Sequence, residues 1–116
     1  MERDVSEALI EPEVVPEGQL VALELAAGGH EAAVLALRRG AVLQVWHNVC
    51  PHAGRRLDYA PGRFLQHEGR LVCAAHGAQF SLEDGRCVDG PGRGGTLAAL
   101  HVTPVPGGWQ VLLAPE

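Results

Sequence analysis

The chain has 116 residues, 47% of them hydrophobic, and a formal net charge of −5. This length can bury one modest core, so we expect a single domain over residues 1–116. An acidic balance without a run of Lys or Arg argues against nucleic-acid binding, and no stretch approaches the roughly twenty apolar residues of a membrane span. Met1–Asp4 lacks the basic start of a signal peptide, so we expect a soluble, cytoplasmic protein.

Frequent turn residues, 15 Gly and 8 Pro, favour short strands over long helices, and helical signal is confined to a few N-terminal residues. Three strand patterns occupy the N-terminal half: Gln19–Leu25, Glu31–Leu37 and Ala41–Trp46. Gly28-Gly29 offers the positive φ of a tight hairpin between the first two, and Arg38–Gly40 gives the next turn. The third strand runs directly toward the first group of candidate metal ligands.

Further strand patterns follow at Arg70–Val72, Gln79–Leu82, Leu97–Val105 and Trp109–Leu113. The last two alternate apolar and polar residues about Pro106–Gly108, which predicts a closing hairpin. We therefore expect an all-β fold in which antiparallel strands from both ends of the chain form a β base.

Two short boxes, Cys50-Pro51-His52 and Cys73-Ala74-Ala75-His76, lie in predicted loops between strands, and each pairs a thiol with an imidazole. Such boxes suit a 2Fe-2S cluster in which two Cys and two His ligate different irons. The same four side chains would also satisfy tetrahedral zinc. Zinc fingers, however, favour two Cys in one knuckle and two His on a helix, so the mixed boxes favour the cluster.

The remaining cysteine, histidines and large aromatic residues are interpreted as structural residues and not as metal ligands or partner contacts. Cys87 is left over after the boxes and is interpreted as a spare, structural thiol. The remaining histidines lack a partner at ligand spacing and are expected at the surface or in packing: His30, His47, His67 and His101. Four aromatic residues are expected in the core: Trp46, Phe64, Phe80 and Trp109.

From about Val14 to Leu113 the order of elements resembles a small soluble Rieske-type 2Fe-2S ferredoxin of the kind that serves oxygenases. The matching features are Cys50–Gly54, Leu57-Asp58, Glu68–Cys73, His76-Gly77 with Phe80, the Asp84-Gly85 turn, and Gly90-Pro91 as a third loop. The resemblance implies an antiparallel Rieske fold with a β base and a smaller cluster-binding lobe at about residues 47–95. By that likeness Cys50 and Cys73 bind the inner iron, and His52 and His76 bind the outer iron.

The chain departs from the family pattern at Ala74, where the second box usually has proline. High-potential respiratory Rieske proteins donate hydroxyl hydrogen bonds from positions that are here Ala78 and Phe80. They also join their loops by a disulfide at positions that are here Arg55 and Ala75. We therefore expect a potential low in the range of Rieske centres, as in ferredoxins that feed oxygenases.

The resemblance implies an electron carrier that catalyses no substrate chemistry, with a flavin-containing NADH reductase as donor and the terminal component of an aromatic-ring dioxygenase as acceptor. Arg55, Arg56 and Arg93 lie near the boxes or the third loop and would steer the histidine tip onto an acidic partner surface. Two alternatives stay open: a small subunit serving assimilatory nitrite reductase, and a zinc-stabilised interaction module.

Overall fold

The computed structural model describes residues 6–51, 54–74, 77–90 and 95–114. Within them lie the strands β1 Ser6–Ile10, β2 Leu20–Ala27, β3 His30–Arg39, β4 Val42–His47, β5 Asp58–Ala60, β6 Arg63–His67, β7 Arg70–Val72, β8 Gln79–Ser81, β9 Cys87–Asp89, β10 Val102–Val105 and β11 Gly108–Ala114. These residues contain no α-helix, only the 3-10 turn η1 at Pro12–Val14, and the predicted all-β antiparallel class is confirmed. Nowhere in the described ranges is there a helix with the length and apolar character needed to cross a membrane.

The chain divides into two compact units. Unit 1 comprises Met1–His47 with Leu100–Glu116, and unit 2 comprises Asn48–Ala99. Unit 1 contains two three-stranded sheets, and unit 2 contains one five-stranded sheet. Both boxes fall in unit 2.

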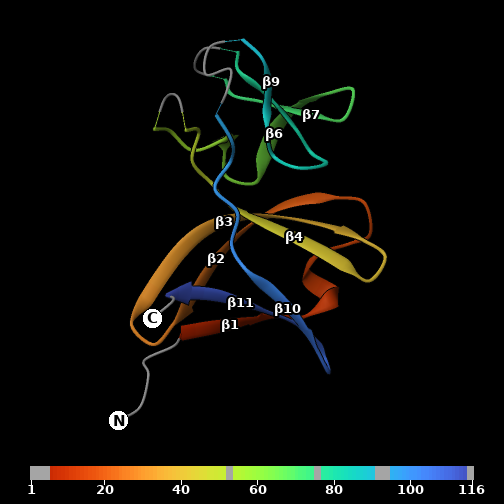
Figure 1. Ribbon diagram of the computed structural model, residues 1–116, viewed down its shortest axis with the longest axis vertical. Coiled ribbons are helices and arrows are strands. Elements are labelled where there is room, and N and C mark those ends of the chain that lie inside the picture. The colour runs from red at the N-terminus through yellow and green to blue at the C-terminus, as the bar shows by residue number, and fades with distance from the viewer. Residues whose placement is uncertain (1–5, 52–53, 75–76, 91–94, 115–116) are drawn as a thin grey trace. The chain divides into compact units, whose positions relative to one another are not determined.

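Unit 1 packs the sheet β1-β11-β10 against the sheet β2-β3-β4. Figure 1 shows β1 beside β11, so strands from the two ends of the chain share one sheet. The hairpin predicted at Gly28-Gly29 is present, with β2 and β3 paired from Leu20↔Leu37 to Ala27↔His30. Apolar side chains from both sheets form one buried core: Ala8, Ile10, Val15, Leu25, Val34, Ala36, Leu43, Val45, Trp109 and Val111.

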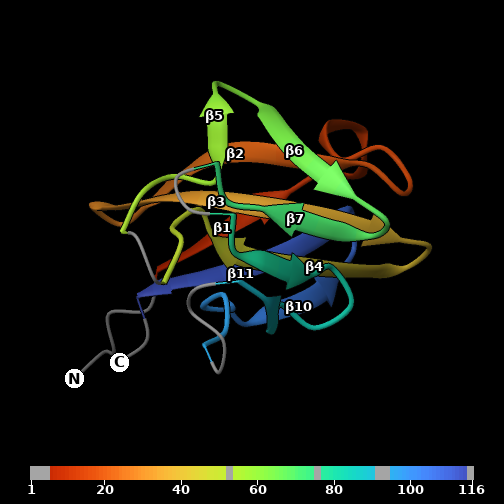
Figure 2. The ribbon, with the colours of Figure 1, turned by 90° about the horizontal axis from the view of Figure 1, so that it is seen from above.

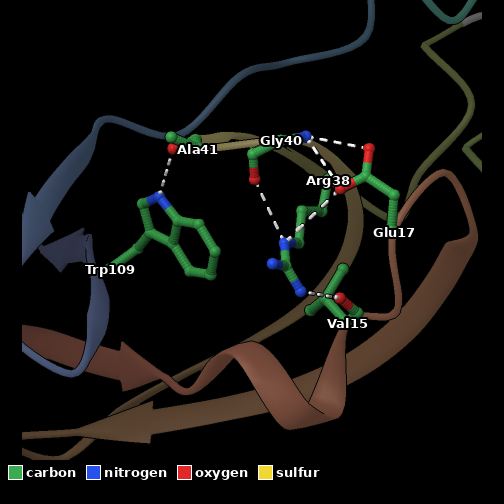
Figure 3. A network of polar contacts seen from close by, with 6 residues as sticks. All are labelled: Val15, Glu17, Arg38, Gly40, Ala41 and Trp109. Atoms are coloured by element: carbon green, nitrogen blue, oxygen red, sulfur yellow. Dashed lines mark hydrogen bonds and ion pairs between the residues drawn. The ribbon is translucent and has the colours of Figure 1, made fainter.

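A polar network at the edge of this core connects Val15 and Glu17, which follow η1, to the β3–β4 turn (Figure 3). The Arg38 guanidinium donates to the carbonyls of Gly40 at 3.1 Å and Val15 at 3.4 Å, and it lies 5.8 Å from the ring centroid of Trp109. Glu17 accepts the Gly40 N–H at 2.9 Å and pairs with Arg38 at 3.9 Å. The Glu17 side chain is 62% exposed, so solvent screens this ion pair.

Unit 2 is an antiparallel meander in which β5, β6, β7, β8 and β9 follow one another in space as in sequence. Figure 2 shows β5, β6 and β7 in succession. Each strand has only three to five residues. The predicted strands at 70–72 and 79–82 are present as β7 and β8, whereas β5, β6 and β9 were not predicted.

Two expectations about the ends of the chain are met only in part. Helical signal was expected in a few N-terminal residues; the 3-10 turn η1 lies there, whereas Ser6–Ile10 form strand β1 with an alternating burial pattern. The strand expected over 97–105 is limited to β10, and the boundary between the units falls between Ala99 and Leu100.

Candidate metal centre

The described parts of the two boxes, Cys50-Pro51 and Cys73-Ala74, lie in loops of unit 2, as the sequence predicts. Cys50 follows β4 and Cys73 follows β7, and the two residues are 0% and 1% exposed. The predicted ligands His52 and His76 lie outside the described residues. The structure therefore describes the sulfur half of the predicted ligand set.

The first loop is closed by two backbone hydrogen bonds around Cys50. The Cys50 N–H donates to the Arg55 carbonyl at 2.7 Å, and the Gly54 N–H donates to the Cys50 carbonyl at 2.8 Å. Gly54 has a φ of 68°, a value that favours glycine because other L-residues rarely adopt it. The loop thus returns on itself directly after the box.

The second loop repeats this arrangement around Cys73. The Cys73 N–H donates to the Ala78 carbonyl at 2.8 Å, and the Gly77 N–H donates to the Cys73 carbonyl at 2.9 Å. Gly77 has a φ of 80°, matching the glycine of the first loop. Two loops far apart in sequence therefore present a buried cysteine at the same position of the same backbone ring.

The segment after β9 approaches the second loop closely. A Cβ placed on Gly90 would lie 2.9 Å from the Gly77 carbonyl oxygen and 3.1 Å from the Ala78 Cα, closer than side chains tolerate. Gly90 therefore packs closely against Gly77 and Ala78, the two residues that follow the second box. Pro91 lies outside the described residues.

Unit 2 has buried apolar side chains of its own. Phe80, Ala78 and Leu71 are 0% exposed, and Leu57 and Leu97 are 1% exposed. Core positions expected for Trp46, Phe80 and Trp109 are confirmed by their burial, whereas Phe64 is only partly buried.

A polar network that the sequence analysis missed lies beside the first loop. Arg56 donates to both oxygens of the Asp58 carboxylate, from Nε at 2.9 Å and from Nη2 at 3.0 Å. Asn48 Nδ2 donates to Asp58 Oδ1 at 3.1 Å, and the Gly62 N–H donates to Oδ2 at 3.2 Å. The Leu57 N–H donates to Asn48 Oδ1 at 2.7 Å. Arg56 and Asp58 stand two residues apart in the sequence, but Leu57 between them lies in a bend, and no sequence pattern marked the pair.

The network keeps Asp58 ionised although its side chain is only 1% exposed. Burial by itself raises the pKa of Asp58. The hydrogen bonds from Arg56, the Gly62 N–H and Asn48, together with the charge of Arg56, outweigh burial. The pKa of Asp58 is therefore lowered from its ordinary value of 3.8.

A polar pocket of about 260 Å³ opens next to this network and is lined by Arg55, Arg56, Asp58, Tyr59 and Ala74. Arg56 is engaged with Asp58, whereas Arg55 is exposed and the structure gives its side chain no hydrogen bond or ion pair within the described chain. Tyr59 is 53% exposed. The two adjacent arginines therefore occupy different environments.

The remaining candidates lie outside this arrangement. All three cysteines are among the described residues and none forms a disulfide; Cys87 is 7% exposed, with its Sγ 3.4 Å from the Asp89 carbonyl. His30, His67 and His101 are exposed, and His47 is partly buried. Within the described ranges, which omit His52 and His76, no three His, Cys, Asp or Glu side chains are grouped to hold a metal ion.

The chemistry of the described donors fits an iron–sulfur cluster. Two thiols are buried, free of disulfides and presented by matching loops, and thiolates are the protein ligands that Fe-S clusters use. An all-β domain with this pair of loops has the features of an iron–sulfur protein.

Comparison with known proteins identifies the family. Residues 7–104 match the model of the Rieske [2Fe-2S] domain, so the chain belongs to that family. A Rieske domain binds a 2Fe-2S cluster, and the predicted cofactor is confirmed at this level. A search of curated proteins gave no match.

Solved structures show the same fold. The ferredoxin of carbazole 1,9a-dioxygenase from Nocardioides aromaticivorans IC177 is similar with a TM-score of 0.62 and 23% identity, over 94% of this chain and 96% of that chain. The terminal oxygenase from that organism has a TM-score of 0.67 at 23% identity, over 97% of this chain. The one from Novosphingobium sp. KA1 has a TM-score of 0.71 at 20% identity, over 98% of this chain. The chain spans 31% of the length of each of these oxygenases.

Proposed function

We propose that this chain is a one-electron carrier whose 2Fe-2S cluster is held by Cys50, His52, Cys73 and His76. Cys50 and Cys73 would bind one iron, and His52 and His76 the other. The observation that carries this proposal is the pair of matching loops, each beginning at a buried cysteine. When bound, the cluster accepts and donates a single electron. We assign residues 1–116 to one Rieske domain without catalytic residues of its own.

The potential should lie low in the range of Rieske centres, which is roughly −150 to +300 mV. Ala78 and Phe80 are both fully buried beside the second loop, and neither side chain has a hydroxyl group to donate to a cluster sulfur. Fewer hydrogen bonds leave the charge of the reduced state less stabilised. A measured midpoint clearly above about +100 mV would contradict this part of the proposal.

The partners we propose are a flavin-dependent reductase as donor and the terminal component of an aromatic-ring dioxygenase as acceptor, all in the cytoplasm. The match to the carbazole dioxygenase ferredoxin supports the oxygenase as acceptor because it covers nearly all of both chains. The reductase is proposed from the family resemblance alone. A further similar structure is described as a complex between oxygenase and ferredoxin in carbazole 1,9a-dioxygenase.

Arg55 is the residue we propose for contact with an acidic partner surface. It is exposed beside the first box, whereas its neighbour Arg56 is bound to Asp58. Charge complementarity mainly raises association rates, so Arg55→Glu should slow electron transfer at low salt and leave the cluster spectrum unchanged. Arg86→Glu, an equal charge change at an exposed residue of the isolated bridge to Thr96, is the control. Equal rates for the two variants would dismiss Arg55 as a docking residue.

The experiment that tests the whole proposal is an EPR spectrum of anaerobically purified, dithionite-reduced protein, with iron, sulfide and zinc analysis. A rhombic spin-half signal of low average g, with two irons and two sulfides per chain, is expected for a Rieske centre. An EPR-silent protein with one zinc per chain would overturn it in favour of the zinc-stabilised module.

A further inference from the structure

The two cluster loops share a backbone ring but differ in the strands that flank them. The second loop connects β7 and β8, which pair directly from Val72↔Gln79 to Arg70↔Ser81. A strand ladder therefore closes it on both sides. The first loop connects β4 and β5, which belong to different sheets. No ladder joins β4 to β5, so the backbone ring around Cys50 is supported from outside by side chains instead of by paired strands.

The returning half of the first loop is bound at three successive residues. The Arg55 carbonyl accepts the Cys50 N–H at 2.7 Å, the Arg56 side chain binds Asp58, and the Leu57 N–H donates to Asn48 at 2.7 Å. Asn48 lies two residues before Cys50 and is 1% exposed. The network therefore holds Asn48, which precedes the first box, together with residues 55–58, which follow it.

The Asp58 carboxylate is the centre of this closure. Each of its oxygens accepts two hydrogen bonds, one from Arg56 and one from either Asn48 or Gly62. A carboxylate offers about four such acceptor sites, so its capacity is filled. Because the side chain is 1% exposed, water cannot easily replace a lost partner. Loss of one member therefore disturbs the others.

We propose that Asp58 and Asn48 are positioning residues for the cluster, which hold the segment carrying Cys50 and His52 in its ligating geometry. Arg56 acts with them as a loop clamp, not as a docking residue. The inference rests on the proposed function, since it requires the first box to ligate the cluster. Mutation of residues that hydrogen-bond or orient metal ligands typically lowers metal affinity by about 10- to 100-fold.

Cluster release from the intact, loaded protein tests this inference. Purified wild type, Asp58→Asn and Arg56→Gln are treated with an iron chelator, and loss of the visible absorption band is followed with time. We expect release to be about 10- to 100-fold faster in both variants, with shifted EPR g values for the cluster that remains. Arg56→Lys, which keeps the charge but not the two-pronged donation, should lie between wild type and Arg56→Gln.

Two controls separate positioning from loss of stability. Arg55→Gln makes the same change one residue away, and its release rate should equal that of wild type. Leu43→Ala removes a buried side chain of the unit 1 core, so it lowers stability while the g values stay unchanged. If Asp58→Asn yields no folded protein, Arg56→Gln decides alone, because the Arg56 side chain is 48% exposed and its loss is milder.

Release rates and g values of Arg56→Gln that equal those of Arg55→Gln would overturn the clamp while leaving the electron-carrier proposal intact. A wild-type protein without a Rieske EPR signal would instead overturn the electron-carrier proposal. The two failures are therefore distinguishable in one set of samples.

Discussion

Units 1 and 2 each contain an arginine bound to a carboxylate, but in opposite surroundings. In unit 1 the Glu17 side chain that pairs with Arg38 is 62% exposed, outside a core supplied by strands of up to ten residues. In unit 2 the Asp58 side chain that pairs with Arg56 is 1% exposed, among strands of three to five residues. Where strands are long, apolar packing supplies stability and the polar network is peripheral. Where strands are short, a buried carboxylate and its hydrogen-bond partners form part of the interior.

Removal of a cluster ligand should have the largest effect and should affect unit 2 selectively. In the proposed ligand set, Cys73→Ala would leave the iron bound by Cys50 and Cys73 with one thiolate, so we expect iron per chain to fall toward zero. Amide hydrogen exchange should then accelerate in residues 48–99 more than in β2, β3 and β4, which have their own core. Cys87→Ala, which also removes a buried thiol, should retain its iron. Equal iron loss in both variants would refute the assignment of Cys73 as a ligand.

Matched leucine truncations sharpen the contrast between the cores. Leu43 in β4, a member of the unit 1 core, and Leu71 in β7 are 5% and 0% exposed, so either change to Ala should cost about 2–5 kcal/mol of unfolding free energy. Leu71 pairs with Phe80 next to the second loop, so Leu71→Ala should also accelerate cluster release, whereas Leu43→Ala should not. Denaturant titration and chelator kinetics measure the two effects. Similar release rates in the two variants would argue against separate cores.

The two carboxylates should differ in their contribution at neutral pH. Asp58→Asn should cost about 1–3 kcal/mol because it weakens charged hydrogen bonds in a buried place, and Glu17→Gln about 0–1 kcal/mol because its pair is solvated. The lowered pKa of Asp58 stabilises the folded state above the unfolded-state value of 3.8. That stability is lost as the pH falls through the folded-state pKa. Denaturant titrations of wild type and Asp58→Asn should therefore converge below pH 3.8; a constant difference would contradict this origin.

A smaller gain is expected in the β6–β7 turn. Glu68 has a φ of 51°, the only non-glycine residue with positive φ in the described chain. Asn tolerates this conformation better than Glu, so Glu68→Asn should raise the unfolding free energy by up to about 1 kcal/mol. Thermal unfolding monitored by circular dichroism would detect it. A lower midpoint would mean that the exposed contact between Glu68 and His67 outweighs the backbone strain.

Strands that combine buried apolar residues with clear turns could be predicted from the sequence, as β2, β3 and β4 were. The hairpin β5–β6 could not, because Tyr59 and Leu65 are 53% and 43% exposed and little apolar burial marks its strands. β1 was hidden because Leu9, which is 51% exposed, stands beside the buried Ile10 and masks the alternation. An alternating sequence pattern reveals a strand only when one face of the strand is apolar and buried and the other is polar. These strands either bury few apolar side chains or carry an exposed apolar residue that breaks the alternation.

The candidate site divides in the same way. The boxes could be predicted because their residue types and order are chemically specific. The network around Asp58 could not, because Asn48 and Asp58 are ten residues apart and nothing in their identity signals burial. The role assigned to Arg56 changed for this reason: as a sequence neighbour of Arg55 it was expected to dock a partner, but its side chain is bound to Asp58.

The matching rings of the two loops have a consequence for the unfolded chain. Proline already occupies the position after Cys50, so the backbone at that place in the ring is compatible with a fixed φ, and Ala74 occupies the equivalent place after Cys73. Ala74→Pro should therefore restrict the denatured ensemble without straining the native loop, a gain of about 0.4–1 kcal/mol. Kinetic refolding and equilibrium unfolding of this variant would show whether one loop can serve as the template for rigidifying the other.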